Sequence, residues 1–138
     1  MRLLEGRVAL VTGAGGGIGR GIALRFAQEG AEVALHCRTA VEPAREVADR
    51  IAGLGGRAVV LRGDLTDDGV CARVVREAAE WGGGRLDALV NNAGVQPVRE
   101  LAGMMPTSGG PSWTPICRAC SPAHRPPRRS CGNTAAAA

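Results

Sequence analysis

A glycine-rich stretch near the start of the chain has residue types that could hold a phosphate group. Residues 12–19 read Thr-Gly-Ala-Gly-Gly-Gly-Ile-Gly, after an apolar run at 8–11 and before a helical pattern of apolar residues that begins at Ile18. Glycines let the backbone approach a ligand without a Cβ atom, and the start of a helix offers free N–H groups and a partial positive charge. The spacing Thr-Gly-x-x-x-Gly-x-Gly is not the general dinucleotide fingerprint Gly-x-Gly-x-x-Gly. The stretch predicts a diphosphate site, and the alternative interpretation is a glycine turn with no ligand.

Cys37 and Arg38 follow the second predicted strand, where an enzyme that uses NAD would place an acid to hold the ribose 2′-hydroxyl. Cys37 occupies that place, and Arg38 beside it could hold a 2′-phosphate through charge-assisted hydrogen bonds. This pair favours NADP, with NAD the less favoured cofactor. The alternative interpretation of Arg38 is a solvated surface arginine, and we interpret His36 as a strand-end residue rather than a base.

Two further segments follow the third and fourth predicted strands. Asp64-Leu65 comes after the third strand, where Asp64 is alternatively a turn residue before a helix. The fourth strand is followed by Asn-Asn-Ala-Gly at 91–94. Asparagine side chains can hydrogen-bond to the backbone of neighbouring strands, and Gly94 would let the nicotinamide half of a cofactor approach closely. All these segments lie where open α/β sheets bind ligands.

The elements that position these residues alternate between strand and helix. Apolar runs without polar alternation predict strands that are covered on both faces, and apolar periodicity that stops at glycine predicts helices. Strands are predicted at 7–12, 32–36, 57–61 and 86–91, and helices at 17–29, at 41–54 and from a cap at Thr66 or Asp67 to about 81. The second helix is expected to bury Val47, Ile51 and Leu54. Helical connections of this length imply a parallel sheet, so the expected fold class is α/β, a Rossmann-like doubly wound parallel sheet.

Together, Thr-Gly-x-x-x-Gly-x-Gly, Asp-Leu and Asn-Asn-Ala-Gly at these spacings resemble the short-chain dehydrogenase/reductase family, and within it the 3-oxoacyl-carrier-protein reductase type. The resemblance covers about residues 5–103. It implies an NAD(P)-dependent oxidoreductase that exchanges hydride between the nicotinamide and a carbonyl or alcohol substrate, with Asp64 and Leu65 against the adenine. The cofactor positions that it implies are Gly13, Ala14, Gly15, Gly16, Ile18, Gly19, Arg38, Asp64, Leu65, Asn91, Ala93 and Gly94.

The catalytic group of the family has no counterpart in this sequence. The resemblance implies a tyrosine that is acidified by a lysine four residues on and aided by a serine, because the proton donor needs a pKa pulled toward neutrality. The chain contains no tyrosine and no lysine. We therefore assign no catalytic residue and expect residues 1–104 to be an NAD(P)-binding half-domain, inactive on its own. The family's last strands and the helices of its subunit interface, through which full-length relatives are oligomeric, are not encoded in these residues.

Residues 105–138 are rich in Pro, Ser, Arg and Cys, contain no acidic residue, and are expected to be disordered by composition. We interpret this tail as a reading-frame slip. If the gene is read one nucleotide earlier from Met104 on, the Met104–Met105 and Trp113–Thr114 codon pairs each force an aspartate. Permitted codons elsewhere give Met-Asp-Ala-Asp-Glu-Trp-Arg-Ala-Val-Val-Asp-Thr-Asn-Leu, which resembles the continuation of family members after Asn-Asn-Ala-Gly.

The tail also has an alternative interpretation as a small metal module. Cys117, Cys120, His124 and Cys131 could form a zinc site beside four arginines and so a nucleic-acid-binding knuckle. Their spacing fits no known zinc module, and Trp113 is the sole aromatic there for base stacking. We expect no metal and no nucleic-acid partner. The competing hypotheses are thus a non-catalytic nucleotide-binding protein, which retained NADP binding would favour, and a zinc or nucleic-acid module, which stoichiometric zinc would favour.

The expected compartment is the cytoplasm. No apolar run is long enough to span a bilayer, and the first residues carry no cleavable apolar segment. The sequence therefore predicts no membrane partner.

Overall fold

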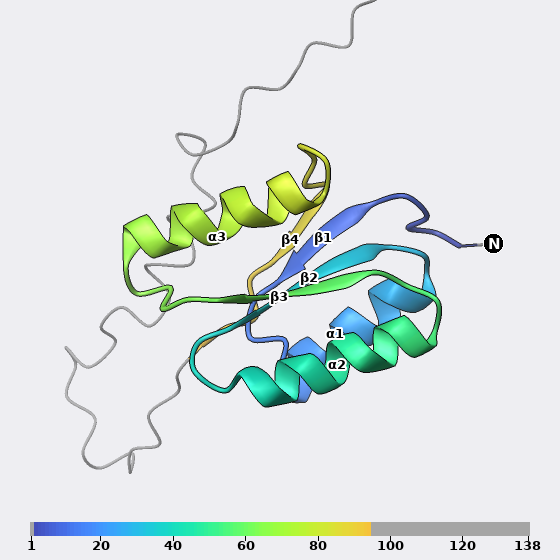
Figure 1. The fold of residues 1–138 in the computed structure, drawn as a ribbon, viewed down its shortest axis with the longest axis horizontal. Coiled ribbons are helices and arrows are strands. Elements are labelled where there is room, and N and C mark those ends of the chain that lie inside the picture. Colours follow the sequence, from blue (N-terminus) through green and yellow to red (C-terminus); the bar gives the residue numbers. More distant parts are fainter. Residues whose placement is uncertain (1, 95–138) are drawn as a thin grey trace, which may run out of the picture.

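A four-stranded parallel sheet with helices on both faces forms the part of the chain that the computed structural model describes, residues 2–94 (Figure 1). The elements in chain order are β1 (Val8–Val11), α1 (Gly17–Gln28), β2 (Glu32–Cys37), α2 (Val41–Gly53), β3 (Ala58–Arg62), α3 (Asp68–Trp81) and β4 (Ala88–Val90). The strand order is β3-β2-β1-β4, and every pair is parallel. The predicted α/β fold class is confirmed.

The two faces of the sheet are covered by different helices. Helices α1 and α2 lie on one face and α3 on the other (Figure 1). Successive residues of β1 serve the two cores, since Leu10 packs in the cluster with α3 and Val11 in the cluster with α1 and α2. Both side chains are fully buried. Burial on both faces explains why β1 reads as a continuous apolar run without polar alternation.

The end of α1 and the start of α3 lie at the glycine and the capping residue that predicted them. Gly30 has a φ of +90° just after α1, a left-handed conformation that glycine adopts without strain. Of the two predicted caps for α3, Asp67 is the residue that caps, because its carboxylate accepts hydrogen bonds from the backbone N–H groups of Gly69 and Val70. Element boundaries lie within two residues of the predicted ones.

Leu54, which was expected to be buried, is exposed, and so is Ile18, a predicted cofactor position. Leu54 is 51% exposed and Ile18 is 75% exposed. The helix α2 ends at Gly53, so Leu54 lies in its C-cap, beyond the face that buries Val47 and Ile51. Ile18 lies in the first turn of α1, at the edge where the strands of the sheet end. In both cases the apolar residue fits the helical period but lies beyond the part of the helix that packs against the core.

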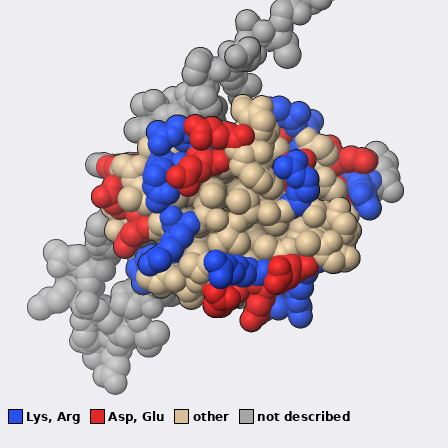
Figure 2. Space-filling model, viewed as in Figure 1, with Lys and Arg blue, Asp and Glu red and all other residues tan. Residues whose placement is uncertain are grey.

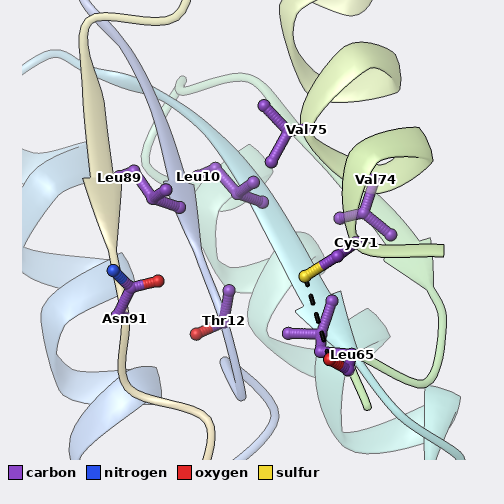
Figure 3. A pocket seen from close by; sticks show the side chains of 8 residues that line it. All are labelled: Leu10, Thr12, Leu65, Cys71, Val74, Val75, Leu89 and Asn91. Carbon is purple, nitrogen blue, oxygen red and sulfur yellow. Dashed lines mark hydrogen bonds between the residues drawn. The ribbon is translucent and has the colours of Figure 1, made fainter. Parts of the chain in front are cut away.

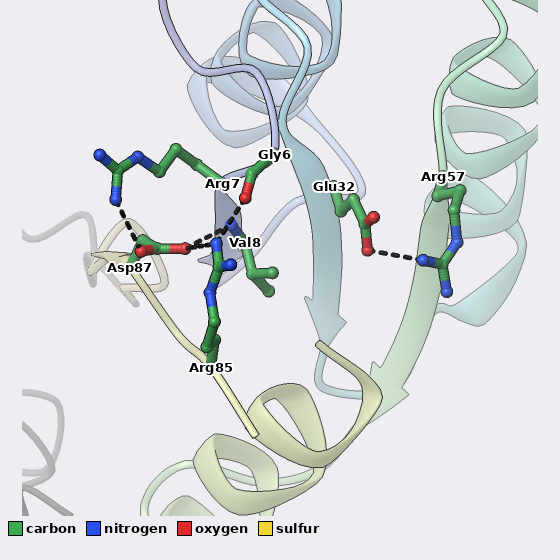
Figure 4. A network of polar contacts seen from close by, with 7 residues as sticks. All are labelled: Gly6, Arg7, Val8, Glu32, Arg57, Arg85 and Asp87. Carbon is green, nitrogen blue, oxygen red and sulfur yellow. Dashed lines mark hydrogen bonds and ion pairs between the residues drawn. The ribbon is translucent and has the colours of Figure 1, made fainter. Parts of the chain in front are cut away.

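A polar cluster joins the strands at their amino ends (Figure 4). The Asp87 carboxylate before β4 accepts hydrogen bonds from the Val8 backbone N–H at 2.9 Å, from Arg7 at 3.1 Å and from Arg85 at 3.2 Å. These contacts, led by the one from Val8, hold the pKa of Asp87 below its ordinary value. Glu32 and Arg57 pair across β2 and β3 at 2.9 Å. This edge is built of structural ion pairs and lies opposite the loops described below.

The described surface carries charges of both signs. Residues 2–94 contain equal numbers of arginines and acidic residues, and several pair one turn apart along a helix, as Arg73 does with Glu77. On the face drawn in Figure 2, blue and red side chains alternate around an uncharged centre. Among the described residues, no helix is long and apolar enough to cross a membrane.

Candidate functional site

The glycine stretch forms a loop from β1 into α1 at the carboxyl edge, the edge of the sheet where the parallel strands end. Gly13 and Gly17 have φ values of +65° and +51°, which side chains with a Cβ atom rarely adopt. Gly19 needs to be glycine for a different reason. A Cβ atom there would overlap the Gly13 carbonyl oxygen and would lie 2.5 Å from Asn92 Nδ2. The glycine types are therefore required by backbone conformation and by close approach.

The start of α1 is open and has no side-chain cap. Gly16 is the N-cap residue, and as a glycine it has no side chain that could accept a hydrogen bond from the first turn. A Cβ atom at Gly16 or at Gly17 would meet nothing within 4 Å. Gly15, in contrast, lies against the start of α2, with Pro43 and Ala44 both 3.4 Å from the position of a Cβ atom. Within residues 2–94, the N–H groups of this first turn and the helix dipole thus lie beside space that a phosphate group could fill.

Thr12 and Asn92 fasten this loop to the end of β4. Thr12 Oγ1 donates to the Val90 carbonyl at 3.1 Å and accepts from the backbone N–H groups of Asn92 and Ala93, both at 2.9 Å. The Asn92 side-chain amide donates to the carbonyls of Thr12 at 3.0 Å and of Gly13 at 3.2 Å. The segment after β4 and the glycine loop therefore form one hydrogen-bonded unit.

His36 connects the glycine loop to the end of β3 by hydrogen bonds. Its backbone carbonyl accepts from the Ala14 N–H at 2.9 Å, and its ring Nδ1 accepts from the Gly13 N–H at 3.4 Å. The other ring nitrogen, Nε2, lies 2.9 Å from the Gly63 carbonyl oxygen. His36 is 2% exposed, and burial lowers the pKa of its ring. A neutral imidazole therefore links the loops after β1 and β3.

Asp64 and Leu65 lie in the loop between β3 and α3 and point in different directions. The exposed Asp64 carboxylate accepts from the Thr66 N–H at 3.0 Å and from its hydroxyl at 2.8 Å. These bonds are the main reason why the pKa of Asp64 lies below its ordinary value, and the nearby Arg38 charge adds to them. Leu65 is buried in the core beneath α3. The interpretation of Asp64 as a turn residue agrees with these bonds, which leave its second carboxylate oxygen for other partners.

Cys37 is the last residue of β2, and Arg38 follows it in a different environment. Cys37 is buried, and burial raises the pKa of its thiol, while the Arg62 charge acts to lower it. Arg62 of β3 is the register partner of Cys37, so both side chains leave the same face of the sheet. Arg38 is exposed at the carboxyl edge. The uncharged side chain of Cys37 therefore ends β2 with one arginine after it in the chain and one beside it on β3.

Asn91 lies apart from the loop and lines a small hollow between β1, β4 and α3 (Figure 3). Thr12 is the other polar residue that lines the hollow. The remaining lining side chains are apolar, namely Leu10, Leu65, Cys71, Val74, Val75 and Leu89. Ala93 contacts the glycine loop, and Gly94 is exposed at the end of the described chain. Within residues 2–94, no three His, Cys, Asp or Glu side chains could hold a metal ion together. The four tail residues of the zinc interpretation lie outside the described part.

Comparison with known proteins identifies this arrangement. The family model for short chain dehydrogenases matches residues 7–107. This chain belongs to the short-chain dehydrogenase family. The hydroxynaphthalene reductase-like protein Arp2 of Metarhizium anisopliae is 46% identical over 95 residues, which are 69% of this chain and 35% of that protein. L-rhamnose 1-dehydrogenase (NAD(P)(+)) of a Sphingomonas strain is 40% identical over 75% of this chain and 41% of its own length.

Solved structures show the same fold. A short-chain dehydrogenase from Burkholderia cenocepacia in complex with NADP superposes with a TM-score of 0.70 at 41% identity, covering 76% of this chain and 42% of that one. A putative short-chain alcohol dehydrogenase from Sinorhizobium meliloti gives 0.68 at 48% identity, covering 75% and 40%. This short-chain dehydrogenase thus spans less than half the length of these relatives.

Three residues of this site were missed by sequence reasoning, namely Thr12, His36 and Asn92. Each makes two or more of the bonds that hold the loops together. Thr12 begins the Thr-Gly-x-x-x-Gly-x-Gly motif, and Asn92 is the second residue of Asn-Asn-Ala-Gly. Each is a polar residue next to an apolar or glycine-rich segment, and this was the signal that could have predicted their hydrogen bonds. His36 gave a similar signal, because a histidine that ends a strand covered on both faces must satisfy two ring nitrogens.

Proposed function

We propose that residues 1–104 of this short-chain dehydrogenase bind a nicotinamide dinucleotide at the carboxyl edge, with the diphosphate on the glycine loop. The observation that carries the proposal is the uncapped start of α1, where Gly16 faces open space while Gly13 and Gly19 are held against Asn92 and Ala93. Helix N–H groups that no side chain satisfies are good anion partners. The relative from Burkholderia cenocepacia was solved in complex with NADP, which supports the same ligand class here.

The cofactor that fits best is NADP. Cys37 is buried and uncharged, and Arg38 is exposed beside it. An arginine can hold a phosphate with paired, charge-assisted hydrogen bonds, whereas an NAD site holds the ribose hydroxyls with an acid. On this proposal Asp64 and Leu65 lie beside the adenine and Asn91, Ala93 and Gly94 beside the nicotinamide half.

The reaction to which this half-site belongs is hydride transfer between the nicotinamide and a carbonyl or alcohol substrate. The cofactor supplies the hydride chemistry, and the residues of this chain bind and orient it. The chain has no tyrosine and no lysine, so it offers no counterpart of the proton donor that the family resemblance implies. We infer binding without reduction for the chain as it stands, with residues 105–138 read out of frame. Because this donor is missing, the second candidate is a protein whose own function is to bind a nucleotide without catalysis. For either candidate we propose the cytoplasm as the compartment.

Substitutions at Gly16 test the site without relying on activity. Asparagine and aspartate are both good N-caps, so Gly16→Asn and Gly16→Asp should leave the fold intact. Only the aspartate puts a negative charge where the diphosphate would lie. Calorimetric titration with NADPH should show binding to the wild type, weaker binding to Gly16→Asn and none to Gly16→Asp. Equal affinities for the two variants would contradict a diphosphate at this helix.

A further inference from the structure

The ring of His36 is the central member of a row of hydrogen bonds across the carboxyl edge. On one side the Asn92 amide donates to the Thr12 and Gly13 carbonyls. The Gly13 N–H then donates to His36 Nδ1 at 3.4 Å, and His36 Nε2 contacts the Gly63 carbonyl at 2.9 Å. The row therefore connects the ends of β4, β1, β2 and β3 in their order in the sheet.

Each of these bonds requires one protonation state of the ring. A backbone N–H can only donate, so Nδ1 must be the unprotonated nitrogen that accepts from Gly13. A backbone carbonyl can only accept, so Nε2 must carry the hydrogen and donate to Gly63. The two partners together select the neutral tautomer with the hydrogen on Nε2. No other residue of the row titrates near neutral pH.

The surroundings of the ring favour the same neutral state. Burial lowers the pKa of His36, and this effect outweighs the Gly63 carbonyl and the Asp64 carboxylate, which both raise it. The other charged or titratable groups on neighbouring elements include Arg38 after β2, Arg62 at the end of β3, the ion pair of Arg73 and Glu77 on α3, and the buried thiols of Cys37 and Cys71. The guanidinium of Arg73 donates to the Arg62 carbonyl at 3.0 Å, next to Gly63. Burial is therefore the cause that favours the neutral ring.

We propose that His36 is a positioning residue, which as a neutral imidazole holds the diphosphate loop and the adenine-side loop together and releases them when it is protonated. The inference rests on the proposed function, because it concerns the geometry of the same cofactor site. Protonation would place a hydrogen on Nδ1 facing the Gly13 N–H, so two donors would oppose each other. Because burial lowers the pKa of the ring, cofactor affinity should be full at and above the ordinary histidine pKa and should fall as the pH drops through the lowered pKa.

The first test needs no cofactor. In the full chain, long-range ¹H–¹⁵N spectra of the histidine rings should show His36 as the neutral tautomer with its hydrogen on Nε2 at about pH 7. The amide signals of Gly13 and Gly63 should shift together as the pH falls toward about 5. They should stay in place over that range in His36→Gln. A charged ring or the opposite tautomer at neutral pH would overturn the proposal, as would amide shifts that persist in His36→Gln.

The second test measures NADPH affinity by fluorescence from about pH 8 to about pH 5. The 2′-phosphate of the ligand also titrates near pH 6, but it does so with every variant and cancels in a ratio. Relative to His36→Gln, the wild type should lose about tenfold in affinity over this range, the equivalent of one hydrogen bond. The control His124→Gln, which changes the other histidine, should behave as the wild type does. A wild-type to His36→Gln ratio that does not change with pH would overturn the inference.

The two tests separate this inference from the proposed function. If the wild type binds no NADPH while the ring and amide signals behave as described, the proposed function fails and the loop-positioning role of His36 stands. If NADPH binds with no dependence on His36, the proposed function stands and this inference fails.

Discussion

At the scale of single residues, Cys37 and Arg38 give the most specific expectation about the cofactor. Combining Cys37→Asp with Arg38→Gln should shift preference from NADPH toward NADH, because it removes a phosphate partner and adds a carboxylate for the ribose hydroxyl. Binding constants for both cofactors would measure the shift. We expect NADPH affinity to fall about tenfold or more, the effect of losing a charged hydrogen bond.

Arg62 is expected to limit the shift in preference from NADPH to NADH. It is the register partner of position 37, so a carboxylate there would lie beside a guanidinium that still attracts phosphate. Adding Arg62→Gln should therefore complete the change in preference. The exchange Arg50→Gln, made on the exposed surface of α2, serves as the control for general loss of charge. An NADPH preference that survives the triple change would show that these arginines do not recognise the phosphate.

Two glycines of α1 should respond in opposite ways to alanine. Gly19→Ala would push a Cβ atom into the Gly13 carbonyl and the Asn92 amide, and we expect it to cost about 1–3 kcal/mol as overpacking does. Gly21→Ala meets nothing within 4 Å and should add about 0.5–1 kcal/mol, because alanine suits a helix interior better than glycine. Denaturant unfolding of both variants measures the contrast. Equal effects would mean that the glycine loop does not pack against Asn92 as described.

At the scale of elements, α3 depends on its cap. Asp67 accepts from two backbone N–H groups, at 2.8 Å and 3.0 Å. Asp67→Ala should destabilise the protein by about 1 kcal/mol, and Asp67→Asn should lose much less because asparagine caps as well. Thermal or denaturant unfolding would show the difference. A loss of similar size in both variants would assign the effect to charge rather than to capping.

The order and type of all seven elements could be predicted from the sequence, because the spacing of apolar residues and the position of glycines determine local backbone structure. Val8–Val11 is buried on both faces and reads as an apolar run, and Asp67 precedes α3 as a cap should. The burial of Leu54 was wrongly predicted, since the helical period does not show where the helix ends. The His36 ring bonds were also missed, because they join residues 23 and 27 positions apart that only the sheet order brings together.

At the scale of the whole molecule, binding and catalysis are expected to separate. On our proposal the chain binds the cofactor, but it has no tyrosine and no lysine, so a bound carbonyl would have no counterpart of the family's proton donor. NADPH oxidation with a panel of ketones and 3-oxoacyl thioesters should stay at the rate without enzyme. A chain with the reading frame restored from Met104 on is the positive control. Turnover by the purified chain itself would reveal a catalytic group among residues that we have not assigned.

The central claim is that NADPH binds across the loops that His36 and Asn92 hold together, and a titration followed by backbone amide spectra tests it most directly. Saturable shifts should concentrate in residues 13–19, at Arg38 and at Asp64 and Leu65, all at the carboxyl edge. The amino-end cluster around Asp87 should not respond. An absence of saturable shifts, or shifts centred on that opposite edge, would contradict the account.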